Sequence, residues 1–194
     1  SRGYAVWAPE YRRLGQDGGG WPGTFEDVGQ AVDLLAKRND PGLDIHRVAF
    51  VGHSAGGHLA LWASGRSRLQ PTQALYTPGP FVPKCMIGLA AITDLQKHIR
   101  ERDECGDEAL QLMEGDVAQR PDRYAQASPV LLGSDVPVVL LHGDSDVMVS
   151  GSQAMAMPGA ETLTLEGAGH FDMIHPGAEA FAVLLQTLEA VMKP

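Results

Sequence analysis

Short apolar runs alternate with amphipathic segments along most of this chain, and this alternation limits the possible folds more than any other feature. Because continuously apolar strands separated by helices are typical of a parallel sheet that is buried on both faces, we predict an α/β fold, with a mostly parallel sheet and helices on both faces. A length of 194 residues fits a single domain, residues 1–194. The runs predict strands at Tyr4–Pro9, Val48–Val51, Met86–Ile92, Val138–Leu141 and Glu161–Leu165.

Helical spacing of apolar residues marks two of the intervening segments. Thr24 to Asp27 resembles a capping box, in which the Thr24 oxygen would accept an unpaired N–H at the start of a helix. The last helix should run from about Gly177 to Lys193. Residues 94–137 are different, because they are polar and contain no good strand. We expect them to form a lid-like or substrate-facing insertion above the sheet.

Composition excludes several classes of partner. The net charge is −9 and no run of lysines or arginines exceeds two, so we expect no nucleic-acid partner. The longest apolar runs are far shorter than the roughly 20 residues that span a bilayer, so we expect no membrane span. Cys85 and Cys105 form neither a disulfide framework nor a zinc-binding spacing, which predicts free thiols, no metal and a cytoplasmic location.

Reactive side chains follow three of the predicted strands. Ser54 lies in Gly-His-Ser-Ala-Gly after the second strand, Asp146 follows the fourth, and His170 follows the fifth. Because ligands bind at the carboxyl ends of strands in such sheets, we expect these three loops to converge. A histidine that a carboxylate orients can take the proton of a serine hydroxyl and later return it to a leaving group. The sequence therefore predicts a serine nucleophile, a histidine base and an orienting aspartate, with no cofactor.

The Gly-x-Ser-x-Gly pattern has a mechanical reason. A serine on a sharp turn from strand to helix takes a strained backbone conformation. We expect positions 52 and 56 to require a small residue, here glycine, so that the turn can close. The same turn would aim the backbone N–H of Ala55 at the oxyanion that develops during acyl transfer.

Some assignments have close alternatives. Asp144 lies two residues before Asp146, and we favour Asp146 as the acid and expect Asp144 to accept hydrogen bonds from loop backbone. His53 and His58 lie near Ser54, and we expect them to pack or to form local hydrogen bonds. Trp21 is a candidate for lining the substrate pocket, although aromatic residues in this kind of fold more often belong to the core.

These motifs together resemble the α/β-hydrolase superfamily, and within it the esterase branch that includes arylformamidases and bacterial carboxylesterases. The resemblance covers essentially the whole chain. It is carried by Tyr11-Arg12, Trp21-Pro-Gly23, Gly52–Ala60, Tyr124–Pro129, His142–Asp146 and Gly167–Asp172.

The resemblance also implies a feature that this sequence lacks. In that branch, a strand ending in a His-Gly-Gly loop supplies the second part of the oxyanion hole, and it lies in the sheet between the strands corresponding to Tyr4–Pro9 and Val48–Val51. Gly18-Gly-Gly20 lies after the first predicted strand and does not substitute for it. We therefore expect the 194 residues to be a fragment or the product of an incomplete gene.

Three functions are compatible with this pattern. The first is hydrolysis of a small carboxylic ester through an acyl-enzyme, with a small-molecule ester or amide as the substrate. The second is arylformamidase activity on an N-formylkynurenine-type amide, because the same three side chains would serve. The third is a catalytically inactive binding module, which the missing oxyanion strand favours.

Overall fold

A computed structural model of the chain describes residues 3–38, 40–101 and 106–193. Four parallel strands form one sheet in the order β1-β2-β3-β4, so that each strand pairs with the next along the chain. The pairing places Ala49 opposite Cys85, Met86 opposite Val138, and Val139 opposite Glu161. The strands are β1 (Ala49–His53), β2 (Cys85–Leu89), β3 (Val138–Gly143) and β4 (Glu161–Leu165).

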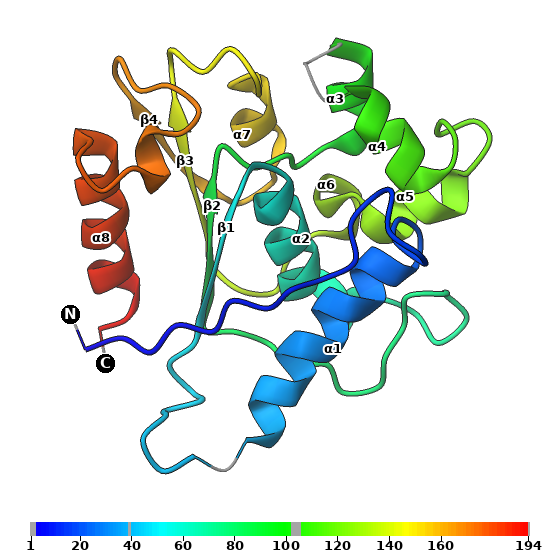
Figure 1. Cartoon of the computed structure of the whole chain (residues 1–194), viewed down its shortest axis with the longest axis horizontal. Coiled ribbons are helices and arrows are strands. Elements are labelled where there is room, and N and C mark those ends of the chain that lie inside the picture. Colours follow the sequence, from blue (N-terminus) through cyan, green and yellow to red (C-terminus); the bar gives the residue numbers. More distant parts are fainter. Residues whose placement is uncertain (1–2, 39, 102–105, 194) are drawn as a thin grey trace.

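Helices cover both faces of this sheet, as predicted (Figure 1). On one face, α1 (Gly23–Lys37) and α2 (Ser54–Gly65) contribute to the larger apolar core. On the other face, α8 (Glu179–Val191) contributes to a second core. The α/β class is therefore confirmed. The shorter helices are η1 (Arg66–Arg68), α3 (Leu95–Glu101), α4 (Gly106–Met113), α5 (Pro121–Ala127), α6 (Pro129–Leu132), α7 (Ser152–Ala156) and η2 (Asp172–Ile174).

The two central strands show why the apolar runs are continuous. Successive side chains of a strand point to opposite faces, so a strand buried on both faces needs apolar residues at every position. Met86 and Leu140 belong to the core on the α1 and α2 face, whereas Ile87 and Leu141 belong to the core on the α8 face. All of β2 and β3 is buried.

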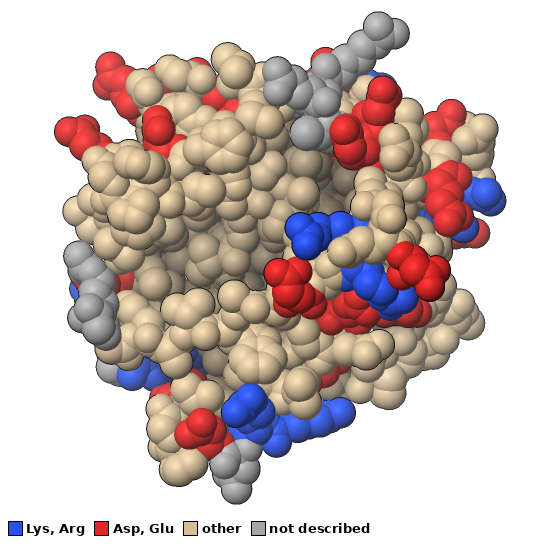
Figure 2. Space-filling view, viewed as in Figure 1, with Lys and Arg blue, Asp and Glu red and all other residues tan. Residues whose placement is uncertain are grey.

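The prediction of a buried strand at Tyr4–Pro9 is wrong. This segment is extended but forms no strand, and Val6 and Trp7 are 87% and 41% exposed. An apolar segment becomes a strand only when a neighbouring strand accepts its backbone hydrogen bonds, and β1 pairs only with β2 among the described residues. The free edge of β1 is open, with Val51 44% exposed. Figure 2 shows a hollow over β1 and β2 whose floor carries no charged side chain.

The predicted capping role of Thr24 is also wrong. The helix begins one residue earlier, at Gly23, and its N-cap position makes no side-chain cap. The Thr24 hydroxyl instead accepts a hydrogen bond from the Gly20 N–H at 2.9 Å and donates one to the carbonyl of Arg12 at 2.5 Å. The carboxylate of Asp27 binds the Arg12 guanidinium. The Thr24 hydroxyl therefore serves backbone groups of the loop before the helix, which need partners, and not the N–H groups of the helix itself.

The segment 94–137 is helical and contains α3 to α6. Leu95, Met113 and Tyr124 anchor it in the larger core, and each is at most 2% exposed. A lid function for this segment stays a prediction. Cys85 is a buried free thiol, whereas Cys105 lies outside the described residues. In the described part of the chain, no helix is both long enough and apolar enough to span a membrane.

Candidate active site

Ser54 has the strained backbone conformation that the motif predicts. It lies where β1 ends and α2 begins, and its φ of 54° falls in the left-handed region that residues with a Cβ avoid. The turn closes because the chain packs backbone against backbone. A Cβ on Gly52 would lie 2.2 Å from the carbonyl oxygen of Gly56, and a Cβ on Gly57 would lie 2.7 Å from the Cβ and 3.0 Å from the Cα of Ala91.

The requirement for a small residue at position 56 is not supported. A Cβ on Gly56 would meet no atom outside the local helix backbone within 4 Å. It is the backbone of Gly56 that approaches Gly52, and this approach needs no missing side chain at position 56 itself. The residues that must be small are therefore Gly52 and Gly57, although the motif alone predicts Gly52 and Gly56.

The predicted acid and base form a short, buried hydrogen bond. The distance between His170 Nδ1 and Asp146 Oδ2 is 2.7 Å, and the side chains of His170 and Asp146 are 4% and 0% exposed. The second carboxylate oxygen of Asp146 accepts the backbone N–H groups of Met148 at 2.8 Å and Val149 at 2.9 Å. These bonds hold the carboxylate in one orientation, and they satisfy the oxygen that does not face the imidazole.

Electrostatics keep Asp146 ionised. Burial by itself raises the pKa of a carboxyl group, but the hydrogen bonds from the two backbone amides and from His170 outweigh it, so the pKa of Asp146 lies below its usual range. An ionised aspartate has no proton to donate, so Nδ1 of His170 carries the proton of this hydrogen bond. Nε2 of His170 is therefore the nitrogen that is able to take a proton.

Asp144 has the different role that its position suggested. Its exposed carboxylate accepts the Gly167 N–H at 2.7 Å, so it joins the aspartate loop to the loop that carries His170. A second bond, from the Ser145 N–H to the carbonyl of Ala168, joins the same two loops. Gly143 permits this approach, because a Cβ there would lie 2.1 Å from the Ala168 carbonyl oxygen.

The elbow and the histidine loop lie at the same edge of the sheet. His53, the residue before Ser54, has Nε2 2.8 Å from the carbonyl oxygen of His170, and the two imidazole centroids are 4.5 Å apart. Among the hydrogen bonds of the described residues, none involves the Ser54 hydroxyl. The structure thus brings Asp146 and His170 into contact, and it places Ser54 beside them without a hydrogen bond.

Two histidines behave differently from our expectation of local packing. His53 binds a carbonyl 117 residues away. His58 is 2% exposed, its Nδ1 lies 3.2 Å from the carbonyl oxygen of Ile92, and its Nε2 has no partner among the described residues. Burial lowers the pKa of His58 to about 4, and neighbouring His98 contributes in the same direction, so the imidazole is neutral at neutral pH.

Ala55 is exposed at the second position of α2, where backbone N–H groups have no partner within the helix. Its N–H is thus available to an anion, although a role in an oxyanion hole stays a prediction.

Trp21 packs edge-to-face on Phe25, with centroids 5.7 Å apart, and lies 5.4 Å below the Arg123 guanidinium. These are core-type contacts, and a substrate role for Trp21 stays a prediction.

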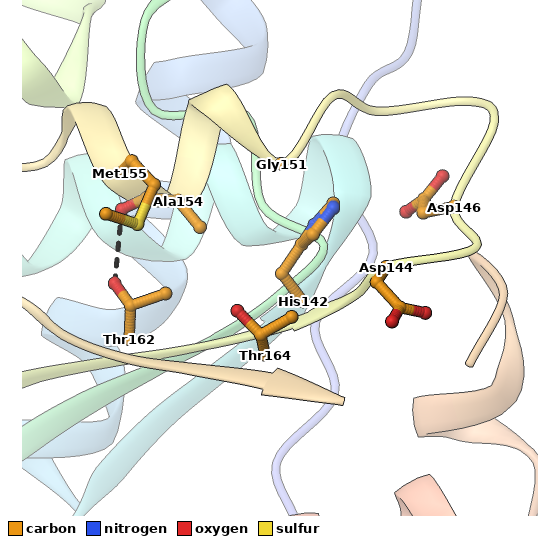
Figure 3. Close-up of a pocket in the computed structure, with 8 residues that line it drawn as sticks. All are labelled: His142, Asp144, Asp146, Gly151, Ala154, Met155, Thr162 and Thr164. Carbon is orange, nitrogen blue, oxygen red and sulfur yellow. Dashed lines mark hydrogen bonds between the residues drawn. The ribbon is translucent and has the colours of Figure 1, made fainter. Parts of the chain in front are cut away.

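A cavity of about 330 Å³ lies on the other side of Asp146, towards α7 and β4 (Figure 3). Neither Ser54 nor His170 lines it, so it is not the space in which the three side chains could act on a substrate. Across the described ranges, no three acidic, histidine or cysteine side chains are grouped so that they could hold a metal ion. The lining residues are His142, Asp144, Asp146, Gly151, Ala154, Met155, Thr162 and Thr164.

Several solved structures share this architecture. A truncated carbohydrate esterase from gut microbiota superposes with a TM-score of 0.71 at 18% identity, over 89% of this chain and 70% of the other. Esterase B from Lactobacillus rhamnosis gives 0.73 at 23% identity, over 94% of this chain and 64% of the other. An acetyl ester-xyloside bifunctional hydrolase from Caldicellulosiruptor lactoaceticus gives 0.67 at 20% identity, over 94% and 70%.

At these identities the superpositions establish the fold, which is that of an α/β hydrolase. None of the curated proteins compared with the chain matches it. The family model BD-FAE, in contrast, matches residues 1–160, which include the serine elbow and Asp146. Because that match extends over most of the sequence and agrees with the parallel sheet and the strained serine, this chain belongs to the BD-FAE family.

Proposed function

We propose that this chain is a serine hydrolase that cleaves small carboxylic esters through a covalent acyl-enzyme. The observation that carries this proposal is the buried 2.7 Å bond between Asp146 and His170 at the sheet edge where Ser54 takes its strained conformation. The similar structures named above are esterases and hydrolases of esters by their titles, which supports the same reaction class.

The reaction follows from the chemistry of these groups. Ser54 Oγ attacks the ester carbonyl while Nε2 of His170 takes the hydroxyl proton, and Asp146 stabilises the resulting imidazolium. The alcohol then leaves with that proton, and the acyl group stays on Ser54. A water molecule attacks the acyl-enzyme with His170 again as the base, which releases the carboxylic acid and restores Ser54.

One contact of this mechanism is absent from the structure and must form when substrate binds. The Ser54 hydroxyl must come within hydrogen-bond distance of His170, as in many enzymes whose catalytic hydrogen bonds tighten in the complex. The Ala55 N–H would stabilise the oxyanion as one donor. Loss of a second donor typically lowers turnover by about 10²–10³-fold, so we expect slow hydrolysis if no other group supplies it.

The test is hydrolysis of p-nitrophenyl acetate by the whole chain and by Ser54→Ala. We expect the variant to lose all turnover above background while its circular dichroism spectrum is unchanged. Turnover by Ser54→Ala equal to that of the parent chain would refute the nucleophile assignment. Arylformamidase activity is an alternative outcome, which direct comparison of N-formylkynurenine with the ester would reveal.

The open edge of β1 and the missing hydrogen bond of Ser54 favour a second candidate, a catalytically inactive binding module. A fluorophosphonate probe separates the two functions, because it reacts with an activated serine and not with an ordinary one. Labelling that requires both Ser54 and His170 supports the hydrolase. Well-folded protein that the probe does not label supports the binding module.

A further inference from the structure

The side chain of His53 makes a contact that the proposed mechanism does not yet use. His53 is the last residue of β1, so its backbone leads directly into the strained serine. Its Nε2 lies 2.8 Å from the carbonyl oxygen of His170. A carbonyl oxygen can only accept, so Nε2 carries the proton and donates it, and Nδ1 of the neutral ring is unprotonated.

This bond joins the loop of the proposed base to the elbow of the proposed nucleophile, whose relative positions determine whether a proton can pass between them. The loop of His170 has two other sets of anchors. One is the aspartate loop, which binds it through the carboxylates of Asp144 and Asp146 and through the N–H of Ser145. The other is the Asp172 carboxylate, which accepts the Gly169 N–H at 2.8 Å. Neither comes from the strand that carries the serine. Among the hydrogen bonds of the described residues, that of His53 joins the elbow directly to this loop.

Ring packing reinforces the same contact. The His53 imidazole lies 4.5 Å from the His170 ring and 5.6 Å from the Phe171 ring, measured between centroids. Phe171 in turn contacts His170 edge-to-face at 4.9 Å. The base is therefore held between the Asp146 carboxylate on one side and the His53 ring on another.

We propose that His53 is a positioning residue, whose Nε2–H bond to the His170 carbonyl holds the loop of the base beside the serine elbow, so that Ser54 and His170 can reach proton-transfer distance when substrate binds. This inference rests on the proposed serine-hydrolase function. It assigns no contact with substrate to His53, so its removal should lower kcat and leave KM unchanged.

The charge state of the ring fits this role. Burial lowers the pKa of His53, and the nearby His170 acts in the same direction, whereas the His170 carbonyl and Asp146 act against them. The ring is therefore neutral at neutral pH, with one proton to donate. The titratable side chains that influence it are His170 on the loop and Asp146 on the neighbouring loop.

Two substitutions separate a hydrogen-bonding role from simple packing. His53→Gln keeps an N–H donor at about the reach of Nε2 but loses the ring, whereas His53→Phe keeps a ring of similar size but loses the donor. We expect His53→Phe to lower kcat by about tenfold or more, because it leaves a half-buried carbonyl without its partner. We expect His53→Gln to retain kcat within about threefold of the parent chain.

The reverse order, with Phe more active than Gln, would show that the ring only packs, and it would overturn the proposal. So would equal kcat in all three proteins. The Ser54→Ala control distinguishes this failure from failure of the proposed function, because turnover by that variant would refute the nucleophile whatever His53 does.

A second measurement needs neither activity nor a folded variant. Nitrogen-15 spectra of the histidine-labelled parent chain at neutral pH report which ring nitrogen of His53 carries the proton. We expect a single Nε2–H tautomer. Detection of the Nδ1–H tautomer, or of exchange between the two, would show that the bond to His170 is not maintained and would refute the proposal.

Discussion

Substitution of Gly52 should damage the serine elbow far more than substitution of Gly56, although both glycines belong to the same motif. A Cβ at position 52 would lie 2.2 Å from the Gly56 carbonyl oxygen, 2.6 Å from the Gly56 carbonyl carbon and 2.8 Å from the Gly57 Cα. All three are backbone atoms, so no side-chain rotation relieves the clash. The two chain segments would have to separate by about 0.8 Å to reach even 3.0 Å.

The magnitude follows from this displacement. Forced overpacking of a well-packed site costs about 1–3 kcal/mol, and a clash between backbone atoms belongs at the upper end of that range. For a chain of this length, about 3 kcal/mol corresponds to a Tm lower by roughly 6–12 °C. The displacement also moves Ser54 relative to His170, and a misplacement of about 1 Å can lower kcat by about 10²-fold.

Gly56→Ala is the matched control. It introduces the same methyl group four residues away, inside α2 and without a tertiary clash. Because glycine is less favourable than alanine in a helix, Gly56→Ala should raise the free energy of unfolding by about 0.5–1 kcal/mol.

Urea denaturation and thermal melting of the parent chain and both variants test this reasoning. The expected signs are opposite, with Gly52→Ala destabilised and Gly56→Ala slightly stabilised. If Gly52→Ala is as stable as the parent chain, or if Gly56→Ala loses as much stability as Gly52→Ala, the described packing of the elbow is incorrect.

Two further predictions concern charge. Asp146→Asn should lower kcat on p-nitrophenyl acetate by about 10³–10⁴-fold, because an amide cannot orient and stabilise the imidazolium. Asp144→Asn should lower kcat by less than about tenfold. Similar losses of kcat in both variants would refute the choice of Asp146 over Asp144. The pKa of His58 is about 4 in the folded chain, so the unfolded chain binds more protons below pH 6.5 and stability should fall as the pH is lowered. This group alone should cost about 2 kcal/mol between pH 7.5 and pH 5 in urea titrations, and a His58→Asn variant whose pH dependence equals that of the parent chain would contradict the assignment.

The sequence predicted that the aspartate and histidine loops would meet because parallel strands end at a common edge. Ser54, Asp146 and His170 each follow an apolar run, and this placement was enough to expect Asp146 and His170 to meet. The preference for Asp146 over Asp144 rested on a separation of two residues, and the structure gives the two carboxylates the distinct partners expected of them.

The outcome for two other segments could not be predicted from their local sequence. The apolar run Tyr4–Pro9 has the composition of a strand, yet it lies exposed because no described strand accepts its hydrogen bonds. Thr24 has the pattern of a helix cap, but its hydroxyl is used by the loop before the helix. In both cases the local signal was real, and a partner elsewhere in the chain decided the outcome.

The amino-acid sequence alone determined the layered α/β architecture and the order of serine, aspartate and histidine, because apolar periodicity and short turn motifs depend on residues close together in the chain. Only the tertiary structure decided that Gly52 and Gly57 close the elbow and that His53 binds the carbonyl of His170. These contacts join backbone and side-chain groups that lie far apart in sequence, or they depend on tenths of an ångström at one turn. Such distances are set when the whole sheet and its loops pack together, and no local pattern encodes them.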